Sequence, residues 1–154
     1  MLSKLNYYVA KKISTNRYLT ILVLLIMSST AYCWDVAPAQ ESSSRYGMGG
    51  RIRDFKEYRQ QASQTGQPFR IEGHCQSACT MFLRLRNACV DPNAELLFHA
   101  GSDQKATQSM LNSYNGALRS YLVANHIMDT TSFTTISGRD IIHRFGYRAC
   151  SPKT

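Results

Sequence analysis

Ser77 and His99 are the two side chains whose type and surroundings could carry covalent chemistry. Ser77 follows the turn 73–76 and opens a helical segment, and His99 ends the next apolar strand. A serine hydroxyl is a weak nucleophile until a nearby base accepts its proton, and histidine commonly supplies that base. We therefore predict a serine nucleophile and a histidine base, provided that the fold brings them together.

Backbone N–H groups close to Ser77 could stabilise the oxyanion that forms when a serine attacks a carbonyl. Ala78 follows Ser77 in the first turn of the expected helix, where N–H groups have no partner within the helix. The Gly49-Gly50 pair lies in a glycine-rich loop that can expose a second N–H without steric hindrance. The group types that acyl transfer needs are therefore all present.

Both side chains also have ordinary structural roles open to them. A serine before a helix commonly caps it, and a single histidine beside an apolar residue is commonly part of the core. A zinc site is a third alternative, and its ligands would be His74, Cys75, Cys79, Cys89 and His99. Because that spacing lacks the paired short Cys-x-x-Cys knuckles of structural zinc sites, we predict no metal and no cofactor.

Segments with helical and with strand spacing alternate along the chain. The expected helices cover residues 51–62, a segment opened by Ser77, 106–127, and a final segment from Ser137 to Gly146; the expected strands cover 69–72, 88–90 and 95–99. Residues 40–46 are polar and are expected to form a lead-in, and 73–76 a turn. Short strands alternating with helices predict an α/β fold with a short, mostly parallel sheet flanked by helices.

The first 39 residues differ from the rest. Basic residues precede an uncharged apolar run over 18–27, and small residues follow at 28–31. This is the order of a secretory signal peptide, and the apolar run is shorter than the roughly 20 residues of a membrane span. We predict a signal peptide or, alternatively, an inner-membrane anchor over 1–39, followed by one domain over 40–154.

Charge is spread thinly over the expected domain. The whole chain carries a net charge of +8, and residues 40–154 hold fourteen Lys and Arg against nine Asp and Glu. The basic residues come singly, which is typical of a solvated surface rather than of a nucleic-acid-binding stripe. We predict a peptide or protein partner, no nucleic acid, and membrane contact only through an uncleaved N-terminal segment.

Four cysteines, Cys75, Cys79, Cys89 and Cys150, lie in the expected domain. An even number of cysteines behind an export signal predicts disulfide bonds and a periplasmic or secreted protein. Three pairings are open. Cys75 with Cys79 is the least expected of them, because two residues about one helical turn apart have poor geometry for a disulfide.

The order of these features resembles that of the Clp protease proteolytic subunit and its relatives in the crotonase superfamily. The likeness covers residues 46–101: the Gly49-Gly50 pair, a helix, a strand, the turn into Ser77-Ala78, a helix, then Phe98-His99. It extends weakly over 137–150, as a closing helix. The resemblance implies that Ser77 is the nucleophile, that His99 is the base, and that Gly50 and Ala78 donate to the oxyanion.

The chain departs from the family pattern in three respects. The polar segment 41–46 replaces a hydrophobic strand, which predicts a truncated sheet. The orienting aspartate has no counterpart in 130–136, and Asp129 is its nearest substitute. Asp140, three residues after Ser137, has the spacing of a helix cap instead. Little chain remains to build the family's oligomeric chamber, so whether the protein forms a homo-oligomer stays open.

Two functions are compatible with these residues. The first is an exported serine hydrolase, peptidase-like, that uses Ser77, His99 and Asp129 with the Gly50 and Ala78 oxyanion donors. The second is a catalytically degenerate Clp-like module in the periplasm that binds a peptide or partner protein, or has a structural role.

Overall fold

The structure is a computed structural model that describes residues 40–153. The predicted signal segment 1–39 and its cleavage site lie outside the described residues. The elements of the described chain follow in order: β1 (Glu41–Ser42), η1 (Ser43–Tyr46), α2 (Ile52–Thr65), β2 (Phe69–Ile71), β3 (His74–Gln76), η2 (Ser77–Arg84), β4 (Ala88–Val90), β5 (Glu95–Phe98), α3 (Gln104–Leu111), α4 (Gly116–Ala124), η3 (Ile127–Asp129), β6 (Thr134–Ser137) and α5 (Gly138–Phe145). Elements labelled η are 3-10 helices.

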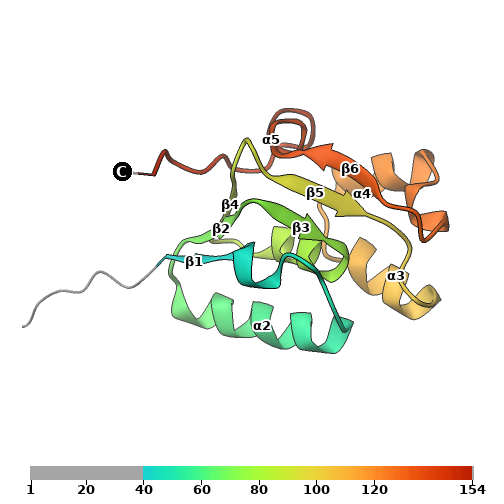
Figure 1. The fold of residues 1–154 in the computed structure, drawn as a ribbon, viewed down its shortest axis with the longest axis horizontal. Helices are drawn as coiled ribbons and strands as arrows, with labels where there is room; N and C mark the ends of the chain where they lie inside the picture. Colours follow the sequence, from blue (N-terminus) through green and yellow to red (C-terminus); the bar gives the residue numbers. More distant parts are fainter. Residues whose placement is uncertain (1–39, 154) are drawn as a thin grey trace, which may run out of the picture. The chain divides into compact units, whose positions relative to one another are not determined.

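The strands form two small sheets. One has the order β1-β2-β4 with parallel pairing throughout, and the other has the order β3-β5-β6 with β3 parallel and β6 antiparallel to β5. In Figure 1, α2 crosses one side of the strands and α5 lies on the opposite side. The described chain is thus a mixed α/β fold with flanking helices, as its alternating pattern predicts, but its strands form two small sheets instead of the single, mostly parallel sheet that the sequence predicts.

Aromatic packing joins α2 to the first sheet. The ring of Phe82, on η2, lies 4.5 Å from that of Phe69, 5.3 Å from that of Tyr46 and 5.5 Å from that of Phe55 between centroids. Phe82 is only 1% exposed. Because a buried aromatic side chain removes about 150–250 Å² from water, this cluster is a major part of the core.

Local signals at helix ends are confirmed. α2 ends at Thr65, and Gly66 follows with φ 63°, a left-handed conformation that glycine adopts with little strain. Ser137 caps α5 by accepting from the N–H of Asp140, and its hydroxyl donates to the Asp140 carboxylate at 2.8 Å. The interpretation of Asp140 as a capping residue is therefore confirmed.

Three predictions about elements are wrong. The expected helix 106–127 is two helices, because Asn112 ends α3 and the Asn115 side chain caps α4. The expected turn 73–76 contains strand β3, which hydrogen bonds to β5. The polar lead-in contains β1, which pairs with β2, so a short strand occupies the place where the sequence predicts none.

The burial of β2 also differs from its pattern. All three of its residues are buried, although alternation predicts one exposed face. Arg70 is the only charged residue of the three, and it is 5% exposed. Its guanidinium donates to the Glu72 carboxylate at 3.2 Å, to the Asp91 carboxylate at 2.8 Å and to the Ser151 carbonyl at 2.8 Å. A buried guanidinium needs such partners, and here they tie β2 to the C-terminal segment.

Two disulfides join the four cysteines, Cys75 to Cys79 and Cys89 to Cys150. The pairing expected least is therefore present. The expectation fails because Cys75 lies on strand β3 rather than on a helix, and the turn that follows brings the Cα atoms of Cys75 and Cys79 to 5.3 Å. Two disulfides indicate an oxidising compartment. Over residues 40–153, none of the helices has the length and apolar character to cross a membrane.

We expect the Cys89–Cys150 bridge to stabilise the fold more than the Cys75–Cys79 bridge. The two disulfides join residues 61 and 4 positions apart, and the entropy of loop closure gives about 4 kcal/mol for the first and about 2 kcal/mol for the second. Urea unfolding of the Cys89→Ala/Cys150→Ala and Cys75→Ala/Cys79→Ala variants measures the difference. An equal or reversed order would contradict it.

We expect the free energy of unfolding to decrease below about pH 5. A hydrogen bond from Lys153 lowers the pKa of Glu72 below its ordinary 4.5, and the backbone N–H of Asn93 lowers the pKa of Asp91 below its ordinary 3.8. Because the folded values lie below the unfolded ones, this stabilisation is complete above the unfolded values and is lost as the pH falls through the folded ones. Urea unfolding between pH 7 and pH 3 tests this.

The variant Arg70→Met should lower the unfolding free energy at pH 7 by roughly 3 kcal/mol, because it removes the buried cation from its carboxylates. It should also make the unfolding free energy depend less on pH below pH 5, since Arg70 contributes to lowering the pKa of both Glu72 and Asp91. A wild type equally stable at pH 7 and pH 3 would contradict the assignment.

Candidate functional site

Ser77 has a left-handed backbone, with φ 55°, at the junction of β3 and η2. Among the described residues, only His126 shares a positive φ without being glycine. A non-glycine residue in this region costs roughly 1–2 kcal/mol, so surrounding contacts must hold it there. Ser77 does not cap the helix: Gln76 occupies the N-cap position and makes no capping bond through its side chain.

Several contacts hold this turn. The Cys75–Cys79 disulfide closes a five-residue ring around Ser77. The Thr80 hydroxyl donates to the Ser77 carbonyl at 2.7 Å and lies 2.7 Å from the Tyr114 hydroxyl. Because threonine has one hydroxyl proton, Tyr114 is the donor in the second bond. Burial raises the pKa of Tyr114 and so keeps it protonated.

The pairing of β3 with β5 brings His99 to the same sheet edge as Ser77. The two strands run parallel, with Gln76 opposite Leu97 at the last paired position. Ser77 follows Gln76 directly, and His99 comes two residues after Leu97. Adjacent strands lie about 4.8 Å apart, so the two residues follow neighbouring strand ends, although neither is itself part of the pairing.

Neither ring nitrogen of His99 has a hydrogen-bond partner among the described residues, although both nitrogens are buried. The ring of Phe133 packs on it with centroids 4.5 Å apart. Loss of hydration lowers the pKa of His99 below its ordinary 6.5, which favours the neutral imidazole. Ser77 and His99 therefore share an edge but do not form a hydrogen bond to each other in this structure.

The Asp129 carboxylate is not a hydrogen-bond partner of His99. It is 2.7 Å from the Nδ1 atom of His126, and both side chains are exposed, by 61% and 81%. His126 is the N-cap of η3 and Asp129 is its last residue, so their contact is local. The backbone next to Asp129 does reach the His99 segment, since the N–H of Ala100 donates to the Thr130 carbonyl at 2.7 Å, but the predicted third residue pairs with His126.

The glycine loop packs directly on the Ser77 turn. The N–H of Gln76 donates to the Gly47 carbonyl at 2.8 Å, and the Gln76 side-chain amide donates to the Met48 carbonyl at 3.0 Å. Gly49, with φ 70°, comes so close that an added Cβ would lie 2.8 Å from the Gln76 carbonyl and 2.9 Å from the Ser77 Cβ. Glycine is required here for both its conformation and its size.

Two backbone N–H groups belong to the Ser77 turn or to the loop that packs on it, that of Gly50 in an exposed residue and that of Ala78 in a residue with 0% exposure. Gly50, with φ 153°, donates to no other described residue, and its residue is exposed. Ala78 is the second residue of η2, where the N–H has no partner within the helix. These are the two donors that the sequence predicts, and both adjoin the loop and turn that pack together.

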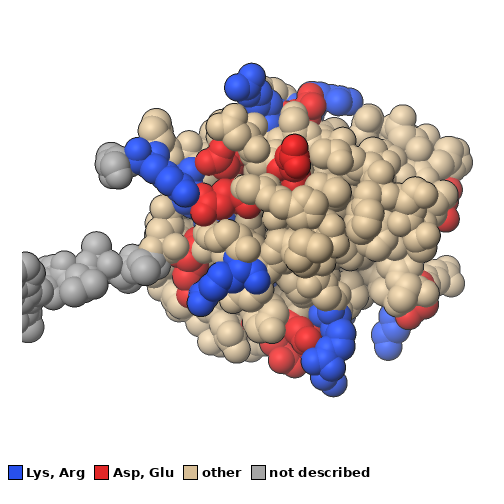
Figure 2. Space-filling view, in the orientation of Figure 1, with Lys and Arg blue, Asp and Glu red and all other residues tan. Residues whose placement is uncertain are grey.

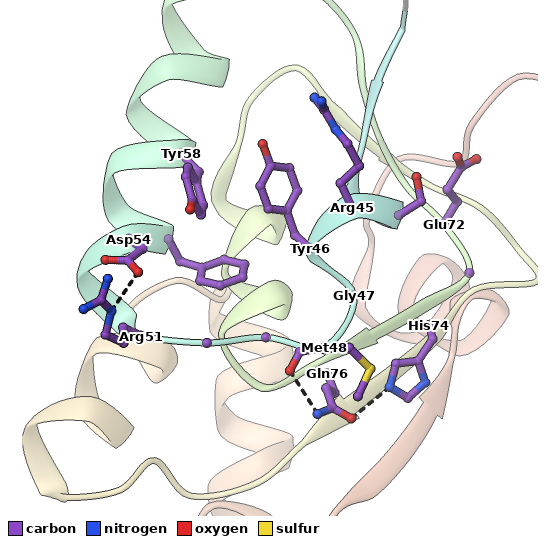
Figure 3. A pocket seen from close by; sticks show the side chains of 15 residues that line it. Arg45, Tyr46, Gly47, Met48, Arg51, Asp54, Tyr58, Glu72, His74 and Gln76 are labelled. Carbon is purple, nitrogen blue, oxygen red and sulfur yellow. Dashed lines mark hydrogen bonds and ion pairs between the residues drawn. The ribbon is translucent and has the colours of Figure 1, made fainter.

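A pocket of about 620 Å³ opens on the outer side of the glycine loop. Figure 3 shows Tyr46 and Tyr58 on one wall and the Met48–Gln76–His74 chain of hydrogen bonds along the floor. Gly49 and Gly50 line it, and the Arg51–Asp54 ion pair, 2.9 Å long, lies at its rim. The pocket can therefore accept an apolar or aromatic group beside Gly50, although Ser77, Ala78 and His99 are not among its lining residues.

The zinc alternative does not fit the described residues. All of its cysteines are in disulfides and cannot act as thiolate ligands. The Nε2 atom of His74 is 2.9 Å from the Gln76 side-chain oxygen. Within residues 40–153, no group of three or more His, Cys, Asp or Glu side chains is arranged to hold a metal ion.

Sequence reasoning missed four residues of this site, namely Gln76, Thr80, Tyr114 and Phe133. Thr80 has a local signal, because a hydroxyl three residues after Ser77 can return to its carbonyl. Tyr114 and Phe133 have none, since each reaches the site from a distant segment of the chain.

No protein-family model and no curated protein sequence matches this chain.

We expect Gly49→Ala to destabilise the protein more than Gly66→Ala. Both glycines are left-handed, so each substitution costs about 1 kcal/mol in backbone strain. Gly66 has open space around the added Cβ, whereas at Gly49 the methyl would meet the Gln76 carbonyl and Ser77. Urea unfolding should show an additional loss of about 1–3 kcal/mol at Gly49. Equal losses would mean that the loop does not press on the Ser77 turn.

Proposed function

We propose that the protein is an exported serine hydrolase with a peptidase-like reaction, in which Ser77 is the nucleophile and His99 the general base. The observation that carries the proposal is the left-handed Ser77 at a strand–helix junction, where the neighbouring strand leads to a histidine with two unpaired ring nitrogens. Strained backbone at one residue, held by a disulfide and a buried hydroxyl pair, is typical of functional sites.

The reaction needs each of these groups in turn. The Ser77 oxygen attacks the substrate carbonyl carbon as a ring nitrogen of His99 accepts the hydroxyl proton, and the carbonyl oxygen becomes an oxyanion. The N–H groups of Gly50 and Ala78 donate to that oxyanion. When the intermediate collapses, the His99 proton passes to the leaving amine, and water later releases the acyl group from Ser77 by the same steps.

Neutral His99 suits the role of base. Its lowered pKa leaves the imidazole uncharged at neutral pH and ready to accept a proton. No carboxylate orients the ring among the described residues, so the expected rate is lower than that of a complete triad. Oxyanion donors and substrate binding still accelerate acyl transfer when the orienting acid is absent.

Substrate and fold follow from the same residues. The 620 Å³ pocket with tyrosines on one wall suits an apolar or aromatic side chain of a peptide. On the face drawn in Figure 2, side chains of both charge signs are interspersed around a broad uncharged area, which suits a polypeptide partner. The proposal includes a relationship to the Clp and crotonase folds, which the order of elements supports. It also includes a location in the periplasm or outside the cell, which the disulfides support.

A catalytically degenerate binding module is the second candidate. The position of Asp129 on the surface, paired with His126, favours it, as does the absence of a hydrogen bond between Ser77 and His99. In that case the pocket beside the glycine loop would bind a peptide segment without cleaving it. The two candidates differ in whether Ser77 is reactive.

A serine-directed fluorophosphonate should label the purified, disulfide-bonded protein at Ser77. Ser77→Ala should abolish labelling and His99→Ala should reduce it by at least about 100-fold, since general-base catalysis contributes 10²–10⁴-fold. Ser63→Ala, on the exposed face of α2, is the matched control and should label normally. Folded wild type that stays unlabelled would reject the hydrolase and leave the binding module.

The rate of labelling should also depend on pH in a defined direction. Since the pKa of His99 lies below 6.5, the rate should be constant above that pH and decline in more acidic solution as the imidazole gains a proton. A rate that keeps rising well above pH 7 would point to a different base.

A further inference from the structure

Four basic side chains line a second pocket, and neither Ser77 nor His99 is among its lining residues. This pocket has a volume of about 420 Å³ and lies among α2, the end of η2, the α3–α4 connection and α4. Its lining consists of four cations and three neutral polar residues: Lys56, Arg59, Arg84 and Arg119, with Ser109, Asn112 and Ser113. No acidic residue lines it.

The cations are held in place by uncharged acceptors. Arg59 donates to the Ser113 hydroxyl at 2.9 Å, and Arg84 to the Asn112 carbonyl at 2.8 Å. Arg119 donates to the Leu111 carbonyl at 2.9 Å. None of these guanidinium groups, nor Lys56, forms an ion pair with another described residue. Their charge is therefore ordered but not neutralised.

Capping of α3 accounts for only part of this arrangement. The carbonyls of Leu111 and Asn112 lie at the C-terminus of α3, and a cation there stabilises the helix. The dipole at a helix end is equivalent to only about half an elementary charge, whereas four positive groups surround the pocket. Desolvation and the nearby charge of Arg84 lower the pKa of Arg59, a sign of repulsion between the two. A surplus of positive charge remains for an anion to offset.

We propose that this pocket binds the phosphate group of a phosphorylated ligand. Guanidinium groups match the tetrahedral oxygens of phosphate with paired N–H donors, and the Lys56 ammonium adds a point charge. Ser109 and Ser113 provide hydroxyl groups beside them. The same chemistry would serve a soluble phosphate ester or the headgroup of a phospholipid. This site is independent of the proposed hydrolase chemistry.

Inorganic phosphate, titrated into the purified disulfide-bonded protein at constant ionic strength, tests the proposal by calorimetry. The wild type should bind phosphate at one site, and the midpoint of thermal unfolding should rise with phosphate concentration, because a ligand of the folded state stabilises it. Arg84→Gln and Arg119→Gln should each weaken phosphate binding by about tenfold or more, as each removes a charged hydrogen-bond donor.

Arg86→Gln is the matched control, because Arg86 is exposed, two residues from Arg84, and lies outside the pocket lining. It should bind phosphate as the wild type does, and so should Ser77→Ala. Absence of binding to the folded wild type, or an equal effect of Arg84→Gln and Arg86→Gln, would overturn the site. The use of two pocket variants guards against misfolding of either, which far-ultraviolet circular dichroism would reveal.

Two further probes separate the sources of phosphate. Glycerol phosphate represents soluble esters, and phosphatidylcholine vesicles with and without phosphatidic acid represent a lipid headgroup. If glycerol phosphate or phosphatidic acid vesicles bind the wild type but not Arg84→Gln, the result supports the pocket and shows whether its ligand is a soluble ester or a lipid headgroup. Binding of vesicles that persists in Arg84→Gln would overturn a role of the pocket in lipid contact.

Discussion

Parallel pairing of β3 with β5 is the interaction on which the candidate site depends. β3 has three residues, yet its register with β5 brings a serine and a histidine, 22 positions apart, to one edge of a sheet. The same strand carries Gln76, whose backbone and side chain both bond to the glycine loop. If β3 did not pair, then the proposed nucleophile, base and oxyanion donors would not be held on one part of the fold.

Short strands give this pairing little stability of its own, and covalent and buried polar contacts support it. The Cys75–Cys79 disulfide joins β3 to η2 across Ser77, and Thr80 with Tyr114 completes the hydrogen bonding of that turn inside the core. Cys89–Cys150 and the buried Arg70 fasten the other sheet to the C-terminal segment. A small domain buries a limited apolar area, so such fastenings replace part of the missing core.

The surroundings of Ser77 and His99 differ in charge from the cationic pocket. At His99, burial lowers the pKa and so favours the neutral imidazole, and the carboxylate of Asp129 faces solvent beside His126. Around the α3–α4 connection, cations gather with no acid lining the pocket. A neutral base is suited to accepting a proton, and unneutralised guanidinium groups are suited to holding an anion. The two regions therefore imply different ligands and can be tested one without the other.

Local sequence signals were sufficient to predict several helix ends and the candidate reactive residues. Gly66 and Gly146 ended helices because left-handed residues are tolerated there, Ser137 capped α5, and the residue types at 77 and 99 pointed to one reaction class. Three strands escaped detection, since β1 is polar, β3 has no apolar run and directly follows Gly73, and β6 exists by pairing with β5. Their stability comes from hydrogen bonds to distant residues, which no local pattern records.

Disulfide pairing, the partner of Asp129 and the cationic pocket were decided only by the tertiary structure. Cys75 and Cys79 could pair because β3 is extended, and the Asp129 carboxylate pairs with His126, three residues before it, although the backbone at Thr130 bonds to Ala100. The four basic residues of the cationic pocket come from three helices, two of them from α2, and are scattered singly in the sequence. Residue type and local caps are properties of neighbours in the chain, whereas convergence of charge is a property of the folded surface.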